Sequence, residues 1–329
     1  MKWLNQIVMG SLLIIFITSS TLYVNTGQSL VYDSNNQEVH SVKFTVLIDN
    51  YPNGTLNTPW GLSILIKTSN LTILFDTGPD PTALRENAEA LGIQLNQLDC
   101  VVISHGHQDH IHAISYVVEQ NPNITVFVPR SMNSFCKEMV TNLTSNMVEI
   151  GPTYSIDNGI NIIGGLYAPL HEQALAINVQ GLGLIIFVGC SHPGVDNILK
   201  RAINDLGVKP FAVIGGFHTL EEEIEYIELL IEKLLETNIT KICPTHCSGD
   251  LIRNYMQTNH FTHYKEVKVG YSTTFQGIII NSSTSLLETT TSRLITTNEE
   301  ASSPNFEFYY GFLALFFFLA LRMKKGRTK

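Results

Sequence analysis

The chain has 329 residues, of which 44% are hydrophobic and 15% are charged, and its formal net charge at pH 7 is −9. About 240 residues remain once the terminal segments described below are set aside, enough for one domain with a well-buried core. Lys and Arg do not cluster in that central region. Because a phosphate backbone requires a basic surface, the composition excludes a nucleic-acid substrate and favours a small molecule.

The chain opens with a targeting signal. Residues 1–27 combine a basic Lys2, an apolar run at 7–17 and the small residues Thr18-Ser19-Ser20. This order of basic, apolar and small residues is typical of a signal peptide. Because the small-residue site is imperfect, an uncleaved signal anchor is the alternative interpretation.

Residues 28–281 are expected to form one catalytic domain of mixed α and β structure. The expected strands are 42–49, 62–67, 71–75, 98–103, 124–128, 174–179, 184–188, 211–214, 239–242 and 271–280. The expected helices are 81–91, 111–118, 131–140, 194–206 and 220–235. Histidines recur where these strands end, and ligand sites in layered α/β folds gather at such ends.

The C-terminal region predicts attachment to a membrane. The Ser/Thr-rich stretch 282–305 has little to bury and is interpreted as a stalk. Residues 306–323 are interpreted as a transmembrane segment and the basic residues 324–329 as a cytoplasmic tail. We therefore expect a cell-membrane protein of archaeal cell-surface type, with a single C-terminal pass and an extracellular catalytic domain.

Glycosylation sequons agree with export of the protein. Asn-x-Ser/Thr sequons begin at Asn53, Asn70, Asn123, Asn142, Asn238 and Asn281. Such sequons mark acceptor sites on exported proteins, so the sequence also predicts a glycoprotein.

The most informative motif is His105-Gly106-His107-Gln108-Asp109-His110, directly after the expected strand 98–103. Imidazole and carboxylate groups are ligands that suit zinc, iron or manganese. The first two histidines lie two residues apart and face one way from an extended segment, whereas Asp109 and His110 turn toward a second point. This geometry suits two adjacent metal ions better than one. The alternative is a histidine-rich surface loop.

Four further motifs accompany this loop. They are Phe75-Asp76-Thr77-Gly78, Gly189-Cys190-Ser191-His192, Gly215-Gly216-Phe217-His218 and Pro244-Thr245-His246-Cys247-Ser248-Gly249. Over roughly residues 42–280 the chain resembles the metallo-β-lactamase superfamily, in particular the branch similar to dihydropterin–ribofuranosyl-aminobenzene phosphate synthase. The resemblance implies an α/β fold, an αββα sandwich of two facing mixed sheets with helices outside.

The resemblance also implies a ligand set. His105 and His107 would hold a first metal, and Asp109, His110 and His246 a second. His192 is the expected third ligand of the first metal, and His171 is the alternative.

Other residues are assigned supporting or catalytic roles. Cys190 stands where most of the superfamily has a metal-bridging Asp. We expect it to pack, and ligation of the first metal as a thiolate is the alternative. Asp76 either orients a ligand imidazole or caps the following turn. Asp109 and His218 are the candidate catalytic residues, with His218 expected to contact the substrate or act as general acid. Trp60 stands where the branch often has His, which predicts an altered pocket.

These observations favour a hydrolase of esters or phosphoesters that activates water with one or two divalent metal ions, zinc first and iron or manganese as alternatives. The expected partners are a small-molecule substrate and the membrane. A transferase like the namesake of the branch is the first alternative. A membrane-anchored binding or sensory protein with a structural metal is the second.

Overall fold

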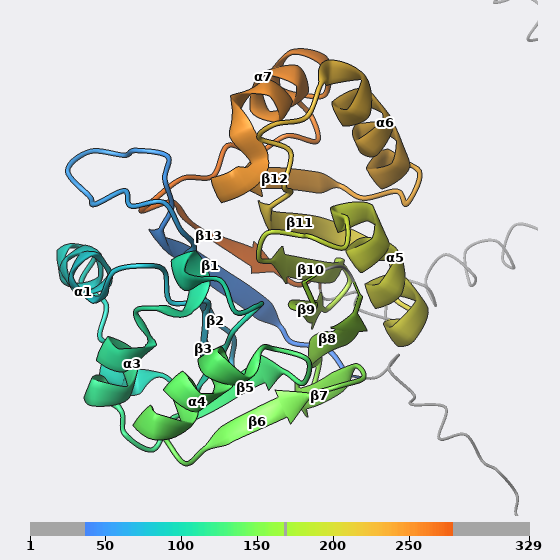
Figure 1. Ribbon diagram of the computed structural model, residues 1–329. Helices are drawn as coiled ribbons and strands as arrows, with labels where there is room; N and C mark the ends of the chain where they lie inside the picture. Colours follow the sequence, from blue (N-terminus) through green and yellow to red (C-terminus); the bar gives the residue numbers. More distant parts are fainter. Residues whose placement is uncertain (1–36, 168–169, 279–329) are drawn as a thin grey trace, which may run out of the picture. The chain divides into compact units, whose positions relative to one another are not determined.

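The computed structural model describes residues 37–167 and 170–278 of the chain. Within these ranges, a pair of β-sheets face each other, and helices cover the outer face of each sheet (Figure 1). The predicted αββα sandwich is therefore confirmed.

The first sheet has seven strands in the order β13-β1-β2-β3-β4-β5-β6. Their bounds are β1 (Ser41–Ile48), β2 (Ser63–Lys67), β3 (Thr72–Phe75), β4 (Cys100–Val102), β5 (Thr125–Pro129), β6 (Met147–Ile150) and β13 (Ser272–Gln276). Neighbours from β13 to β3 pair antiparallel, whereas β3, β4, β5 and β6 pair parallel.

The second sheet has six strands in the order β12-β11-β10-β9-β8-β7. Their bounds are β7 (Tyr154–Asp157), β8 (Ile160–Leu166), β9 (Glu172–Val179), β10 (Gly183–Val188), β11 (Pro210–Gly216) and β12 (Lys241–Thr245). Strands β10, β11 and β12 pair parallel, so their carboxyl ends lie at the same edge of the sheet.

The helices follow the parallel strands. They are α1 (Pro81–Ala90), η2 (Leu95–Gln97), α2 (Gln108–Ile111), α3 (Ile114–Gln120), α4 (Ser134–Leu143), α5 (Val195–Leu206), α6 (Ile224–Leu235), η3 (His246–Ser248) and α7 (Gly249–Asn259). Local chemistry fixes their ends. Asp80 caps α1 through a 2.8 Å hydrogen bond from the Thr82 N–H, and Gly207 ends α5 in the left-handed conformation.

Three apolar layers hold the sandwich together. Between the sheets, Phe44 of β1 meets Phe187 of β10 edge to face, with ring centroids 5.6 Å apart. A second layer joins the second sheet to α5, α6 and α7, and a third joins the first sheet to α1, α3 and α4. Because these layers fix the strands, the loops at the strand ends are held in defined positions.

One expectation is wrong: a cell-membrane location with a single C-terminal pass and an extracellular catalytic domain. No helix in residues 37–167 and 170–278 is long and apolar enough to cross a membrane. A span needs about 20 apolar residues, whereas the longest described helices, α5 and α6, have 12 residues each. The predicted signal segment 1–27 and the C-terminal segments 282–305, 306–323 and 324–329 lie outside the described residues.

Candidate metal centre

The histidine-rich loop joins β4 to α2 and turns at Gly106. A Cβ on Gly106 would lie 3.2 Å from Cys136 Sγ and 3.2 Å from Met132 Cγ, so the tight packing leaves little room for a side chain. After the turn, His107 is the N-cap residue of α2. Because a helix projects its side chains differently from an extended segment, the loop supplies ligands to two adjacent positions.

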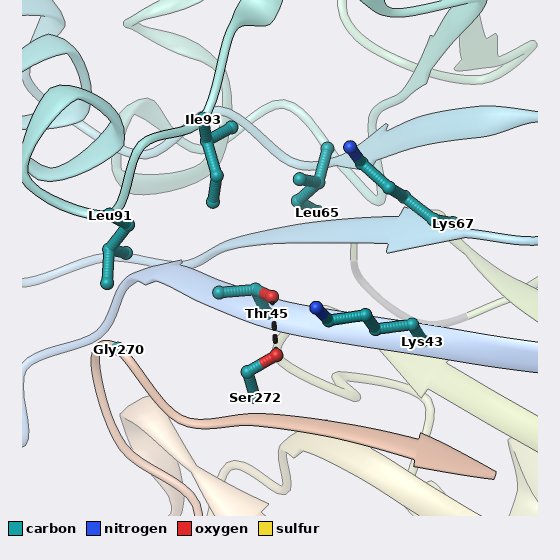
Figure 2. A pocket seen from close by; sticks show the side chains of 8 residues that line it. All are labelled: Lys43, Thr45, Leu65, Lys67, Leu91, Ile93, Gly270 and Ser272. Atoms are coloured by element: carbon teal, nitrogen blue, oxygen red, sulfur yellow. Dashed lines mark hydrogen bonds between the residues drawn. The ribbon is translucent and has the colours of Figure 1, made fainter.

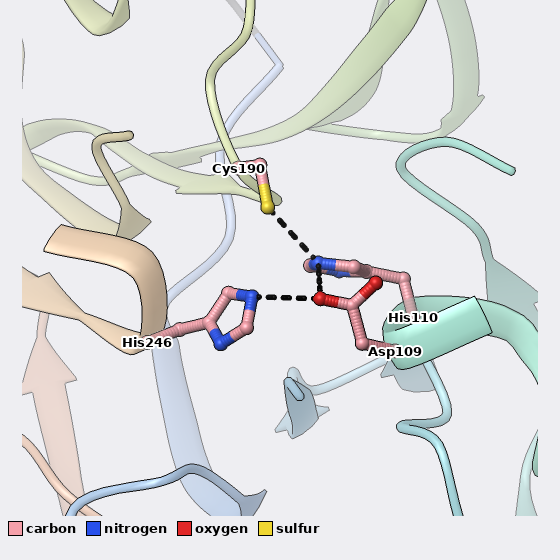
Figure 3. A group of neighbouring side chains, drawn as sticks. All are labelled: Asp109, His110, Cys190 and His246. Atoms are coloured by element: carbon pink, nitrogen blue, oxygen red, sulfur yellow. Dashed lines mark hydrogen bonds and ion pairs between the residues drawn. The ribbon is translucent and has the colours of Figure 1, made fainter. Parts of the chain in front are cut away.

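Four side chains meet where this loop reaches the ends of β10 and β12 (Figure 3). They are Asp109, His110, Cys190 and His246, here called group A, and their ligand atoms all lie within 4.8 Å of one another. Oδ2 of Asp109 lies 3.2 Å from Nε2 of His246 and 3.6 Å from Nε2 of His110. Sγ of Cys190 lies 3.1 Å from Nε2 of His110.

The outer nitrogens of the imidazoles in group A already have partners. Nδ1 of His110 lies 2.7 Å from Oδ2 of Asp76, and Nδ1 of His246 lies 3.0 Å from Oδ1 of Asn50. With an acceptor beside each Nδ1, the inner Nε2 is left as the ligand atom. Nε2 of His246 is buried without a hydrogen bond and faces the carboxylate of Asp109. The ligand atoms of four side chains thus converge within 4.8 Å of one another while the outer imidazole nitrogens are already occupied, so group A fits a metal ion.

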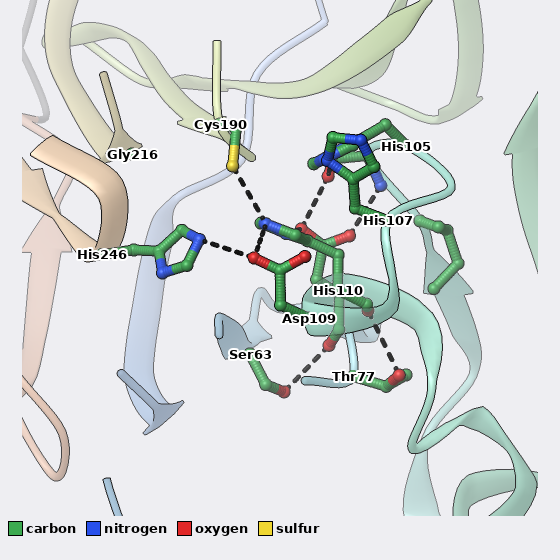
Figure 4. Close-up of polar contacts among 12 residues, drawn as sticks. Ser63, Thr77, His105, His107, Asp109, His110, Cys190, Gly216 and His246 are labelled. Atoms are coloured by element: carbon green, nitrogen blue, oxygen red, sulfur yellow. Dashed lines mark hydrogen bonds and ion pairs between the residues drawn. The ribbon is translucent and has the colours of Figure 1, made fainter. Parts of the chain in front are cut away.

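A second group lies on the other side of Cys190 (Figure 4). The ligand atoms of His105, Cys190 and His192 also lie within 4.8 Å of one another. His107 adjoins them, because its Nδ1 lies 3.1 Å from Nε2 of His105 and its ring lies 5.1 Å from that of His192. We call His105, His107, Cys190 and His192 group B. Cys190 is therefore common to both groups.

Acceptors also hold the outer nitrogens in group B. Nδ1 of His192 lies 3.0 Å from Oε2 of Glu172, which is buried and also accepts two backbone N–H groups from the loop after β10. Nδ1 of His105 lies 2.9 Å from Oγ of Ser104, which in turn donates to Oδ2 of Asp76 at 2.7 Å. One buried carboxylate, that of Asp76, thus supports ligands of both groups.

Hydrogen bonds beneath the ligands fix the backbone (Figure 4). The Ser63 hydroxyl donates to the carbonyl oxygen of Asp76 at 2.8 Å. The Thr77 hydroxyl donates to the carbonyl oxygen of His110 at 3.2 Å, and the Thr77 N–H donates to the same oxygen at 2.7 Å. The loops after β3 and β4 are therefore tied together.

Four residues at strand ends adopt a left-handed backbone. The φ angles are 55° for Asp76, 63° for Ser191, 55° for His218 and 49° for His246. Across the described residues, only Asn238 shares this conformation among non-glycine positions. Such residues cost about 1–3 kcal/mol each and cluster at functional sites. The strand ends of β3, β10, β11 and β12 are thus one strained region that meets at the ligands.

Burial and charge set the protonation of most ligands. Burial holds the pKa of His105 well below its usual value and lowers that of His110 to about 3. Burial alone would raise the pKa of Asp109, but the neighbouring imidazoles of His246 and His110 lower it. Burial would lower the pKa of His246, but Asp109 and other nearby negative charges raise it. Neutral imidazoles and an ionised carboxylate bind metals, whereas His246 must first lose a proton.

Cys190 also belongs to a third cluster. Its Sγ and the ligand atoms of His218 and Cys247 lie within 4.8 Å of one another. The hydrogen bond with Cys247 and burial raise the pKa of the Cys190 thiol. The sequence predicts that Cys190 packs, whereas the geometry places its sulfur among the ligand atoms of groups A and B, which makes it a candidate ligand.

The other predicted residues lie at different distances from this centre. The ring of His218 lies 4.7 Å from that of His192, and His218 is exposed. Trp60 lies 5.0 Å from His246, measured between ring centroids. His171 packs against Tyr167, with ring centroids 5.0 Å apart, and belongs to none of the three clusters formed by the described residues.

Sequence reasoning gave no role to three residues that hold the site. Glu172 and Asn50 fix outer imidazole nitrogens, and Oδ1 of Asp49 accepts the N–H of His246 at 3.0 Å. Burial raises the pKa of Asp49 to about 7. A usable signal was present, because Asp49-Asn50 follows a strand in the same way as Asp76 does.

Fold and site together define a class of protein: an αββα sandwich with a His/Asp/Cys centre for a divalent metal at the carboxyl ends of its parallel strands. The model of the metallo-beta-lactamase superfamily matches residues 61–246, more than half of the chain. The chain belongs to this superfamily, and the family predicted from its motifs is confirmed.

Individual relatives agree with this assignment. A 7,8-dihydropterin-6-methyl-4-(beta-D-ribofuranosyl)-aminobenzene-5'-phosphate synthase of Methanocaldococcus jannaschii is 27% identical over 285 residues, covering 71% of this chain and 96% of that protein. The structure of Tm1679, described as a metal-dependent hydrolase of the beta-lactamase superfamily, has a TM-score of 0.62 at 21% identity, covering 71% of this chain and 99% of that one. YhfI from Bacillus subtilis has a TM-score of 0.51 at 15% identity, covering 72% and 100%.

Proposed function

We propose that the protein is a metal-dependent hydrolase of esters or phosphoesters, in which groups A and B each hold one divalent metal ion. The observation that carries the proposal is that each of four imidazoles has an oxygen acceptor on the side away from the ligand cluster. In His105, His110, His192 and His246, Nδ1 meets an oxygen outside the group, which leaves Nε2 to face inward. Outer partners of this kind orient metal ligands in proteins.

The centre is also accessible, because His107 and His192 are partly exposed and a cavity adjoins the third cluster, and this access favours catalysis over a structural metal. A cavity of about 290 Å³ is lined in part by His218 and Cys247, two members of the third cluster. A structural metal site is closed, whereas a catalytic site keeps an open position for substrate. The binding or sensory alternative has no comparable observation in its favour.

The chain supplies the proton transfers that hydrolysis requires. When bound, a divalent metal supplies Lewis acidity and makes water acidic enough, with a pKa of about 7, to give hydroxide at neutral pH. Asp109 is ionised; it orients the attacking water and accepts one of its protons. The water oxygen would add to the acyl or phosphoryl centre as its proton passes to Asp109, and the bond to the leaving oxygen would break. His218 then protonates that oxygen.

The electrostatics of His218 suit this role. Its hydrogen bond to Cys247 raises its pKa above the usual value, although burial opposes the change. A larger share of His218 is therefore protonated near neutral pH, which is the state that a general acid requires.

A transferase is the second candidate. The synthase from Methanocaldococcus jannaschii favours it, because the similarity covers 96% of that protein. Its phosphorylated substrate would need a cationic contact. Among the described residues, the cavity beside the metal centre is lined by the carboxylates of Glu221 and Glu222 and by the imidazole of His218, and no Lys or Arg lines it. The local charge therefore favours hydrolysis of an ester.

The test uses the full-length protein, stripped of metal by a chelator and reloaded separately with zinc, manganese or iron(II). Hydrolysis of 4-nitrophenyl acetate and of bis(4-nitrophenyl) phosphate is then measured. We expect turnover that disappears with the metal and returns on reloading. Turnover that persists without metal, or none on any substrate after full loading, would contradict the proposal.

A further inference from the structure

The cavity beside the metal centre has an aromatic wall. Trp60 is 47% exposed and is one of the residues that line the cavity. Its position is fixed by the next residue, because a Cβ on Gly61 would lie 2.5 Å from the carbonyl oxygen of Asp109 and 2.4 Å from Cδ of Pro79. The Leu62 N–H also donates to the Asp109 carbonyl at 3.2 Å. The backbone that follows Trp60 is thus held against α2, and the indole lies 5.0 Å from the imidazole of His246, measured between ring centroids.

The lining also includes acidic residues, which an anchored loop carries. Glu221 and Glu222 line the cavity together with Leu220. The loop that carries them is tied to η3 by two hydrogen bonds. The Thr219 hydroxyl donates to the Ser248 carbonyl at 2.7 Å, and the Leu220 N–H donates to the Cys247 carbonyl at 3.1 Å. Within the described ranges, neither carboxylate forms an ion pair.

A second cavity provides a contrast (Figure 2). It has a volume of about 260 Å³ and is lined by Lys43 and Lys67, with Thr45 and Ser272 joined by a 2.9 Å hydrogen bond between their hydroxyls. It lies over β1, β2 and β13 and, unlike the cavity at the centre, contains no residue of the three clusters. Lysines therefore line a cavity away from the clusters, whereas carboxylates line the cavity beside them.

We propose that the cavity at the centre binds an organic cation carried by the substrate, next to the scissile ester. This inference rests on the proposed hydrolase function. The face of an indole attracts a cation within about 6 Å, and the effect is largest for desolvated quaternary ammonium groups. The unpaired carboxylates of Glu221 and Glu222 add a negative potential in the same cavity. An anionic substituent would meet both carboxylates, which outnumber the single imidazole, that of His218, in the lining.

Three acetate esters test the proposal with the metal-loaded, full-length protein. Acetylcholine carries a trimethylammonium group, 3,3-dimethylbutyl acetate replaces it with an uncharged group of the same shape, and 4-acetoxybutanoate carries a carboxylate. Acid release is followed at constant pH. We expect kcat/KM for acetylcholine to exceed that for the neutral ester by about tenfold, and the anionic ester to be hydrolysed least.

Variants assign the preference to the cavity. Trp60→Leu and the double change Glu221→Gln with Glu222→Gln should each reduce the cation preference, measured as the ratio of kcat/KM for acetylcholine to that for the neutral ester, to about twofold or less. Trp60→Phe should restore most of the preference, because it keeps an aromatic face. Glu228→Gln is the matched control, since Glu228 is an exposed carboxylate of α6 that does not line the cavity.

Binding of choline, measured by calorimetry, separates the two proposals. If the metal-loaded protein hydrolyses no ester, the hydrolase proposal fails. The cation site is still supported in that case if the affinity for choline falls in Trp60→Leu but not in Glu228→Gln. If esters are hydrolysed without a cation preference, or with one that survives both cavity variants, the cation site is wrong and the hydrolase stands. A protein that neither binds choline nor prefers acetylcholine overturns the inference.

Discussion

Groups A and B use the same kinds of side chain but differ in charge and exposure. Group A contains the carboxylate of Asp109, and its His110 and His246 are completely buried. Group B has no carboxylate of its own, and its His107 and His192 are partly exposed. Because a carboxylate adds a full negative charge, group A should bind a divalent ion more tightly at neutral pH. Burial and charge therefore predict different metal affinities for groups A and B, although the histidine-rich loop contributes ligands to both.

The largest expected effect comes from removing one ligand of each group. His246→Ala should lose the metal of group A and keep that of group B, and His192→Ala should do the reverse. Losing an outer partner costs about 10–100-fold in affinity or activity, so each ligand change should cost at least that in hydrolysis. Elemental analysis and an ester assay measure both effects.

His171→Ala serves as the control for this pair, because His171 lies outside all three clusters. A His192→Ala protein with full metal content, beside a His171→Ala protein that has lost an ion, would replace His192 by His171 in group B. If the His192 and His246 variants both keep all their metal, the division into two groups is wrong.

Changing a residue that accepts a hydrogen bond from an imidazole Nδ1 should also affect the metal of one group only, but by a smaller factor. Glu172→Gln weakens the support of His192 and should lower metal affinity in group B by about tenfold or more. Asn50→Ala removes the acceptor of His246 and should act on group A by a similar factor. Metal competition titrations on the two variants decide this, with thermal unfolding as the control for folding. Equal losses at both groups in both variants would speak against separate support.

The role of Cys190 can be read from proton release. Because the pKa of its thiol is raised, Cys190 holds a proton at pH 7 and must lose it to bind a metal as thiolate. The wild-type protein should therefore release about one proton more than Cys190→Ala on metal binding. Calorimetry in two buffers of different ionisation enthalpy counts these protons. Equal release would mean that Cys190 packs without ligating, as the sequence suggests.

As the pH is lowered, groups A and B should lose their metal ions at different pH values. The pKa of His246 is raised above its ordinary value of 6.5, so protons already compete with metal in group A above pH 6.5. The lowered pKa values of His105 and His107 keep those imidazoles of group B neutral at such a pH. As pH falls from about 8 to about 5.5, group A should lose its ion first. Metal content after equilibration at each pH measures this, and simultaneous loss from both groups would contradict it.

Much of the fold could be predicted because its signals are local. The strand before Asp76 and the strand before the histidine-rich loop both end where an apolar run stops. Helix α7 was not predicted. Its residues 249–259 are mostly polar, and its burial depends on contacts of Ile252 and Met256 with the second sheet.

The ligands were easier to predict than their supports. Histidines in dense motifs have few uses other than metal binding, so His105 and His110 could be identified from spacing. Glu172 lies 20 residues before His192 in the sequence, and only the antiparallel pairing of β9 with β10 brings it beneath that imidazole. Contacts that depend on strand pairing are not visible in a single sequence.

The metal content of the full-length wild-type protein decides whether groups A and B form a metal centre. It is measured by elemental analysis after loading near pH 8 and removal of free metal. We predict about two divalent ions per chain, one for each group. We also predict that His246→Ala and His192→Ala each retain about one. A wild-type protein that retains no ion would contradict the assignment of groups A and B as metal ligands.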